Sequence, residues 1–259
     1  MNAFVETTIL TDALLKPGSA KNLAAKAALK RYAKTELPVY AIREFKAGPL
    51  HYFCYFHNKL VTTKSLADTV AALNQLSPFQ RYLKSTSFEA LEAAIRIGGE
   101  KANPDDDLAD RYRLSTAKLI VQSWRRRRKL THSTVQDLPC YVECAPQLNK
   151  DGIFDSKPRD CDPAVECCLA KQLRLNPEAL RLMRDSIPET SVRQEDRNRR
   201  AVLKRLIKHP KERLDKKSCK QLGDAYFAFF CPEDSVILTT NIKDHQPLAA
   251  SIGKVVEKP

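Results

Sequence analysis

The sequence predicts an α/β protein with a parallel sheet and a mainly helical insertion. Near both ends of the chain, short apolar runs alternate with segments of helical periodicity, which is typical of βα units in a parallel sheet. Residues 61–214 instead show helical periodicity interrupted by prolines. We therefore expect residues 1–60 and 215–259 to form one core that meets in space, and residues 61–214 to form the insertion.

The first 60 residues contain the N-terminal half of this core. Lys16-Pro17-Gly18 ends a short helix, and Ser19 is suited to cap the next one. Pro38 is tolerable near the start of a strand. In order, we expect a strand at 2–5, helices at 9–14 and 19–34, a strand at 37–41 and a helix at 42–56.

The C-terminal half of the core begins with a helix over residues 217–230. Leu222, Ala225 and Phe229 recur at three- and four-residue steps, and Pro232 cannot continue the helix. Residues 236–238 then form a short β-branched run that favours a strand covered on both faces. The end of another helix and a last strand at 254–256 complete the expected sheet.

Six segments of the insertion have the periodicity of helices, and prolines separate them. These segments are 65–76, 79–97, 107–129, 163–175, 177–185 and 192–208.

The composition favours an anionic partner. The formal net charge is +13 and the sequence pI is about 9.4, which favours nucleic acid over a membrane surface. No run approaches the roughly 20 apolar residues of a membrane span. The N-terminus lacks the basic and apolar regions of a signal peptide, so we expect a cytoplasmic protein. With 7 glycines, no glycine-rich phosphate loop is present.

Acidic and polar side chains follow the predicted strands. Glu6-Thr7-Thr8 follows the first strand, Glu44 lies in the first turn of the helix after the second, and Thr239-Thr240-Asn241 with Asp244 follows the third. Asp224 lies near the start of a helix rich in small residues. In open α/β sheets, ligands bind at the carboxyl ends of the strands. We therefore expect Glu6, Glu44 and Asp224 to converge there.

These motifs resemble those of the PIN-domain ribonucleases, a family that includes many bacterial toxin nucleases. The resemblance covers roughly the first 60 and last 45 residues and implies a three-layer α/β/α core with endoribonuclease activity that depends on Mg²⁺ or Mn²⁺. It implies catalytic roles for Glu6, Glu44, Asp224 and Asp244, metal binding by Glu6, Glu44, Asp224 and Asn241, and auxiliary roles for Thr7, Thr8, Thr239 and Thr240. The sequence departs from the family pattern in having Glu6 where the first acid is usually Asp, and in the size of its insertion.

Three functions remain open at this stage. The first is an endoribonuclease that acts on structured RNA such as tRNA, as a toxin or defence effector held in check by an antitoxin protein. The second is a catalytically inactive module that binds RNA or scaffolds a complex, with Glu6 marking a decayed metal site. The third is a DNA nuclease. Each acid, taken alone, also fits an ordinary surface or helix-end residue.

A run of arginines in the insertion indicates a surface that could bind nucleic acid. Trp124 is followed by Arg125, Arg126, Arg127, Arg128 and Lys129. These six consecutive helical positions wrap more than once around the axis, so the arginines cannot all face one phosphate strand. We expect some of them to contact RNA phosphates, and Trp124 to stack on a base. A solvated helix end is the alternative.

Cysteines crowd residues 140–168 of the insertion. The spacing of Cys140, Cys144, Cys161 and Cys167, with Cys168 next to them, predicts a structural zinc site. Reduced, mostly buried thiols are the alternative in a chain without an export signal. His245 follows the last acidic motif, where it could contact substrate or simply pack.

Overall fold

The structure is a computed structural model that describes residues 1–99, 107–136, 138, 141–155, 168–210, 212 and 214–259. Five parallel strands form one sheet in the order β3-β2-β1-β6-β7. Its strands are β1 (Asn2–Val5), β2 (Lys34–Pro38), β3 (Ser133–Val135), β6 (Ser235–Leu238) and β7 (Val255–Glu257). A separate antiparallel pair joins β4 (Gln147–Leu148) to β5 (Phe154–Asp155).

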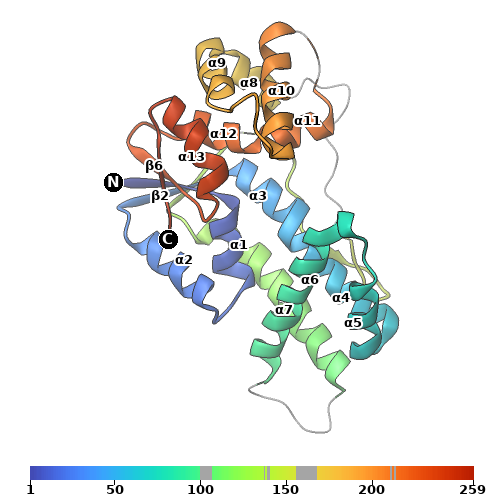
Figure 1. The fold of residues 1–259 in the computed structure, drawn as a ribbon. Helices are drawn as coiled ribbons and strands as arrows, with labels where there is room; N and C mark the ends of the chain where they lie inside the picture. The colour runs from blue at the N-terminus through green and yellow to red at the C-terminus, as the bar shows by residue number, and fades with distance from the viewer. Residues whose placement is uncertain (100–106, 137, 139–140, 156–167, 211, 213) are drawn as a thin grey trace.

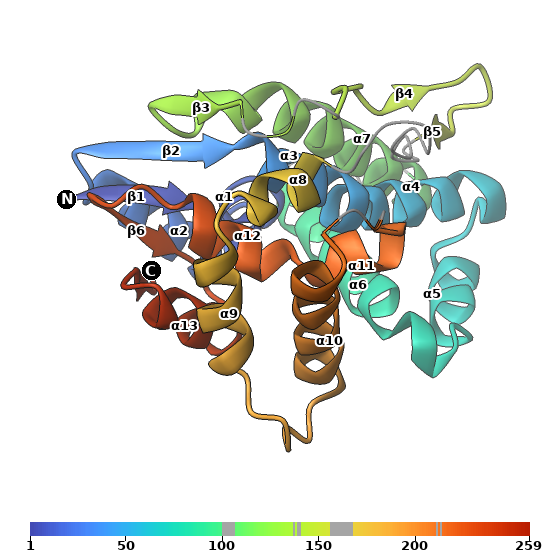
Figure 2. The ribbon, with the colours of Figure 1, turned by 90° about the horizontal axis from the view of Figure 1, so that it is seen from above.

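The sheet is centred on β1, whose two neighbours come from opposite ends of the chain. Phe4 pairs in register with Glu36 of β2 and with Ile237 of β6. All four residues of β6 are buried, as the continuous apolar run predicts. Because β1, β2 and β6 are parallel, their carboxyl ends lie at the same edge of the sheet (Figure 2).

Helices cover both faces of this sheet and make a three-layer α/β/α arrangement. On one face lie α1 (Thr7–Leu15) and α2 (Ala20–Lys30), and on the other lies α12 (Gly223–Phe230) (Figures 1 and 2). The ring of Phe4 meets that of Phe227 edge-on at 6.1 Å, which fixes α12 against β1. The helix α13 (Ile242–Ser251) follows β6 and packs on α12 and β7.

The helices of the insertion, together with two helices that the sequence assigned to the core, form two groups at different places in the molecule (Figure 1). The first group surrounds α4 and contains α4 (His51–Thr63), α5 (Leu66–Asn74), α6 (Arg81–Gly98) and α7 (Leu108–Arg126). The second contains α8 (Cys168–Arg174), α9 (Pro177–Asp185), α10 (Gln194–Lys208) and α11 (Lys216–Gln221). Helix α9 of the second group packs against α13, and α8 packs against α12. The second group is thus attached to the part of the core that carries Asp224 and Asp244.

Several predicted boundaries differ from those in the structure. The helix expected at 19–34 ends at Lys30, before β2 begins. Strand β2 covers Lys34–Pro38 instead of residues 37–41, because Pro38 is the N-cap of α3 (Val39–Phe45) and the next three apolar residues enter that helix. The helix expected at 42–56 is three segments, since the π-helical turn η1 (Lys46–Leu50), which contains Pro49, separates α3 from α4. The helix expected at 217–230 breaks at Leu222 into α11 and α12.

Strand β3 was not predicted, and it corrects the division into core and insertion. Its three residues pair with Glu36, Leu37 and Pro38 of β2, so the insertion itself supplies an edge strand of the sheet. The segment is short and only partly buried, which explains its weak strand pattern. The remaining insertion helices occur close to the predicted segments. None of the helices in the described ranges is long and apolar enough to cross a membrane.

Candidate functional site

Glu6 is the first acidic residue at the carboxyl edge of the sheet. It follows β1 directly and caps α1, because its Oε2 accepts a hydrogen bond from the Thr8 backbone N–H at 2.8 Å. The same oxygen accepts hydrogen bonds from the hydroxyls of Thr8 at 2.5 Å and Thr239 at 2.9 Å. Glu6 is 5% exposed. Three donors on one oxygen hold this buried carboxylate in a single position.

The two halves of the core meet at these threonines. Thr239 follows β6 and is fully buried, and its Oγ1 also accepts a hydrogen bond from the Asn241 backbone N–H at 2.9 Å. The Thr240 backbone N–H donates to Thr8 Oγ1 at 3.0 Å. The predicted auxiliary threonines 8, 239 and 240 therefore connect the end of β1 to the end of β6.

Glu44 lies beside Glu6 on the helix that follows β2. Its Oε2 accepts a hydrogen bond from Thr7 Oγ1 at 2.7 Å, so neighbouring residues of α1 hold the two glutamates. The N-terminus of α12 approaches Glu44 closely at Gly223. A Cβ on Gly223 would lie 2.8 Å from Glu44 Oε1 and 2.8 Å from Tyr40 Oη. Glycine is thus the residue that this approach permits.

Burial and two other acids raise the pKa of Glu44 to about 7. Loss of hydration is the largest cause. The Glu44 side chain is partly exposed, but protein atoms surround its carboxylate densely. The negative charges of Glu6 and Asp224 raise the pKa further, and hydrogen bonds from Thr7 and Tyr40 oppose the shift. Glu6 and Asp224 are therefore each near enough to Glu44 to act on its pKa.

Asp224, in the first turn of α12, has an arginine and a histidine as partners from outside the sheet. Its Oδ2 accepts a hydrogen bond from Arg199 of α10, whose side chain is 7% exposed. Its Oδ1 lies 3.3 Å from His245 Nε2. His245 is fully buried, and its ring meets Phe227 edge-on at 5.5 Å. His245 therefore packs in the core behind Asp224 and does not face solvent.

Asp244 and Asn241 form a neighbouring group on α13. Asn241 Nδ2 donates to Asp244 Oδ2 at 2.8 Å, and Arg193 donates to Asp244 Oδ1. Burial acts to raise the pKa of Asp244, but the hydrogen bonds from Asn241 and Arg193 and the charge of Arg193 lower it overall. The amide of Asn241 is directed at Asp244, so this pair forms a polar contact with α10.

The carboxylate oxygens at this edge are of the type that binds a hard divalent cation. Their arrangement suits a cation only in part, because arginines already pair with two of the acids. Within the described residues, no three His, Cys, Asp or Glu side chains are grouped as metal ligands. Arg199 and Arg193 already supply positive charge to Asp224 and Asp244. Glu6 and Glu44 form no ion pair in the described part of the chain, which leaves them as the acids best placed to meet a cation.

The arginine run is divided between buried and exposed positions. Trp124 is 7% exposed, and the Arg127 guanidinium lies over its ring at 3.7 Å. Arg127 and Arg128 also pair with Glu143. Trp124 is therefore a core residue of α7 and has no free face for a base, which corrects the expected stacking. Arg125 and Arg126 are exposed and remain available to phosphate.

The predicted zinc site falls mainly on residues that lie outside the described ranges. Cys140, Cys161 and Cys167 are among these residues, and Cys168 marks the start of α8. Cys144 is described and is a free thiol, in contact with Lys46. Cys54, Cys219 and Cys231 are buried, as expected of core cysteines.

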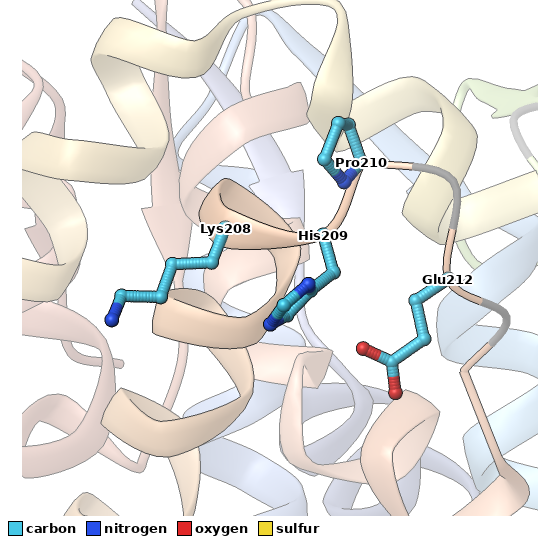
Figure 3. Close-up of a pocket in the computed structure, with 4 residues that line it drawn as sticks. All are labelled: Lys208, His209, Pro210 and Glu212. Atoms are coloured by element: carbon cyan, nitrogen blue, oxygen red, sulfur yellow. The ribbon is translucent and has the colours of Figure 1, made fainter.

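A pocket of about 510 Å³ lies away from the acidic residues, at the C-terminal end of α10. Lys208, His209, Pro210 and Glu212 line it (Figure 3). Arg199 is nine positions before Lys208, or roughly 13 Å along the helix axis. The pocket is therefore separate from the carboxylates.

Sequence reasoning missed Arg193 and Arg199 as parts of the acidic site. Both lie in a charged helix that reads as a solvated surface, and their spacing of six positions does not single them out. The alternation of Arg193, Asp196 and Arg199 at three-residue steps is the one available signal, since these positions share a helix face.

Comparisons with protein-family models, with curated proteins and with solved structures find no match to this chain.

Proposed function

We propose that the protein is a divalent-metal-dependent endoribonuclease with a PIN-like site formed by Glu6, Glu44 and Asp224. The observation that carries the proposal is the approach of Glu6 and Asp224 to Glu44, whose pKa is raised first by burial and further by these two charges. These acids come from three distant segments of the chain and approach one another at the carboxyl edge of a parallel sheet. Repulsion among buried carboxylates is relieved by a cation, which is why such clusters bind metal ions.

The chemistry that Mg²⁺ or Mn²⁺ would supply at this site is an activated water nucleophile and neutralised charge on a phosphate. Glu6 and Glu44 would hold the ion, with Asp224 and Asn241 as further ligands once their present partners release them. Thr8 and Thr239 orient Glu6, and Thr7 orients Glu44. Because hydrogen bonds fix these side chains, the site requires little rearrangement around the two glutamates.

RNA is the proposed substrate because the protein is strongly basic and has exposed arginines outside the acidic site. The formal charge is +13, and Arg125 and Arg126 are exposed at the end of α7. The size of the helical insertion suits a structured RNA such as tRNA. The resemblance to toxin nucleases extends the proposal to a toxin or defence effector with an antitoxin partner.

A second candidate, an RNA-binding module without catalysis, has support from the ion pairs of Asp224 and Asp244. Arg199 and Arg193 occupy these acids, and the described residues contain no complete group of metal ligands. In such a protein the arginines would be permanent replacements for a metal ion.

Cleavage assays distinguish the candidates. Purified protein is incubated with labelled RNA or DNA in Mn²⁺, in Mg²⁺ or in EDTA, beside Glu6→Gln and Glu44→Gln variants. Glu92→Gln serves as the control, since this acid lies in an exposed pair with Arg96. The proposal expects RNA cleavage by the wild type and the control, and loss of cleavage in EDTA and in both site variants. RNA binding without cleavage supports the second candidate, and cleavage of DNA alone identifies a DNA nuclease.

A further inference from the structure

A buried lysine and a partly exposed cysteine are in contact at a place that the proposed nuclease site does not use. Lys46 Nζ lies 2.6 Å from Cys144 Sγ. Lys46 belongs to η1, directly after α3, whereas Cys144 lies in the segment before β4. Lys46 is 2% exposed, so its amine reaches the thiol from inside the protein.

The surroundings of Lys46 leave the thiol as its main polar partner. Glu143 is next to Cys144 but pairs with Arg127 and Arg128. The Trp124 ring lies 5.9 Å from Lys46 Nζ. In the described part of the chain, no carboxylate forms an ion pair with Lys46. A lysine at this depth is ordinarily paired with an acid, and here the side chain is directed at sulfur instead.

We propose that Lys46 and Cys144 form an oxidation site, at which a peroxide converts the contact into a covalent nitrogen–sulfur bond. The site is independent of the proposed nuclease function. The reagent class is a small two-electron oxidant such as hydrogen peroxide, which can reach Cys144 because this residue is partly exposed.

The reaction takes two steps. In the first, the Cys144 sulfur attacks hydrogen peroxide, the O–O bond breaks, and the products are a sulfenic acid and water, so that sulfur is oxidised and peroxide is reduced. In the second, the lone pair of Lys46 Nζ attacks that sulfur. The N–S bond forms, the S–O bond breaks, and hydroxide leaves as water with a proton from nitrogen. The product is a sulfenamide, of the kind that sulfenic acids form with nitrogen.

Three other cysteines lack the exposure of Cys144. Cys54, Cys219 and Cys231 are 0%, 7% and 2% exposed. Burial raises the pKa of the Cys231 thiol to about 12, which leaves almost no thiolate at neutral pH. These residues serve as internal controls for the selectivity of the reaction.

The cross-link would connect two segments that are far apart in sequence. Lys46 and Cys144 are separated by 98 positions. A covalent bond over such a loop restricts the unfolded chain, as a disulfide does. It would attach the end of α3, the helix that carries Glu44, to the segment before β4, and we expect the midpoint of thermal unfolding to rise after oxidation.

The test uses peptide mapping of the full chain. Protein is purified with EDTA and a reductant, transferred to a buffer without reductant, and treated with hydrogen peroxide. Trypsin digestion and mass spectrometry should reveal one peptide that contains both Lys46 and Cys144, lighter by two hydrogen atoms than its reduced components and uncleaved at Lys46. A thiol reductant should reverse the product.

Two variants distinguish formation of the N–S bond from oxidation of an exposed thiol alone. Lys46→Arg retains positive charge but removes the nucleophilic amine, so dimedone should capture the Cys144 sulfenic acid in this variant and much less in the wild type. Cys144→Ser should abolish the cross-link. The proposal is overturned by a disulfide between Cys144 and another cysteine, by bound zinc that retains Cys144 as a ligand through the EDTA step, or by oxidation that stops at sulfinic acid in the wild type.

Discussion

Arg199 of α10 forms an ion pair with Asp224 of α12, which ties the second group of insertion helices to the acidic edge of the sheet. Arg193 makes the equivalent contact with Asp244 of α13. The charged segment that reads as a solvated surface therefore directs two of its arginines toward acids of the core. A metal ion that uses Asp224 must compete with Arg199 for it.

Replacement of Arg199 should destabilise the fold and free Asp224. In Arg199→Gln we expect a loss of about 2 kcal/mol in the free energy of unfolding, because Asp224 is left half-buried without its guanidinium. Urea denaturation measures the loss, and Mn²⁺ titration should show tighter binding than in the wild type. Arg96→Gln removes an exposed arginine from its pair with Glu92 and should cost less than about 1 kcal/mol. Equal losses in the two variants would contradict the prediction.

Gly223 should be intolerant of even one extra carbon. In Gly223→Ala the new Cβ would be 2.8 Å from Glu44 Oε1 and from Tyr40 Oη, so α12 or Glu44 must shift. We expect about 1–3 kcal/mol of destabilisation and reduced RNA cleavage. Gly48→Ala is the matched control, since its Cβ would meet nothing within 4 Å. A neutral Gly223→Ala variant would show that the close approach does not matter.

The stability of the protein should depend on pH through Glu44. The pKa of this carboxyl is about 7 in the folded chain against an ordinary value of 4.5, so the folded state binds the proton more tightly. The contribution of Glu44 to the free energy of unfolding is fully present below about pH 4.5 and is lost as the pH rises through 7. Between pH 5 and pH 8, Glu44→Gln should therefore gain about 2 kcal/mol relative to the wild type, measured by urea denaturation.

A divalent cation should reduce this pH dependence. A metal ion bound by Glu44 favours its ionised form, so saturating Mn²⁺ should flatten the stability profile of the wild type and leave that of Glu44→Gln less changed. If Mn²⁺ alters neither profile, Glu44 does not bind the ion.

The exposed arginines of α7 should contribute to RNA affinity without selecting a sequence. An Arg125→Ala, Arg126→Ala double variant should bind several RNAs uniformly more weakly and lower the slope of log K against log salt by roughly two. Fluorescence anisotropy at several salt concentrations measures both effects. By contrast, Arg127→Ala should mainly lower stability, because Arg127 stacks on Trp124 and pairs with Glu143. A double variant with unchanged salt dependence would rule out a phosphate contact here.

Most strands and helices could be predicted from the sequence because their patterns are local. The apolar runs of β1 and β6 identify buried parallel strands, and the prolines of the insertion separate its helices. Strand β3 could not be found in this way, since its three half-buried residues form a strand only because β2 lies beside them. The break between α11 and α12 likewise depends on tertiary contacts, including the close approach of Gly223 to Glu44.

The convergence of Glu6, Glu44 and Asp224 followed from the rule that parallel strands share a carboxyl edge. The partners of these acids did not follow from it. Arg199 reaches Asp224 only through the packing of α8 and α9 on the core, which no local pattern encodes. For Trp124 the sequence predicted a contact that the structure does not allow. An aromatic residue next to an arginine run is equally typical of a nucleic-acid surface and of a core covered by Arg127.

The position of β1 in the sheet determines when, during synthesis, the acidic edge can form. The neighbouring strand β6 and the threonine that fixes Glu6 emerge from the ribosome only after residue 239, so a nascent chain has Glu6 and Glu44 long before it can assemble them. The acidic edge of the sheet is therefore completed only when the last part of the chain has been made.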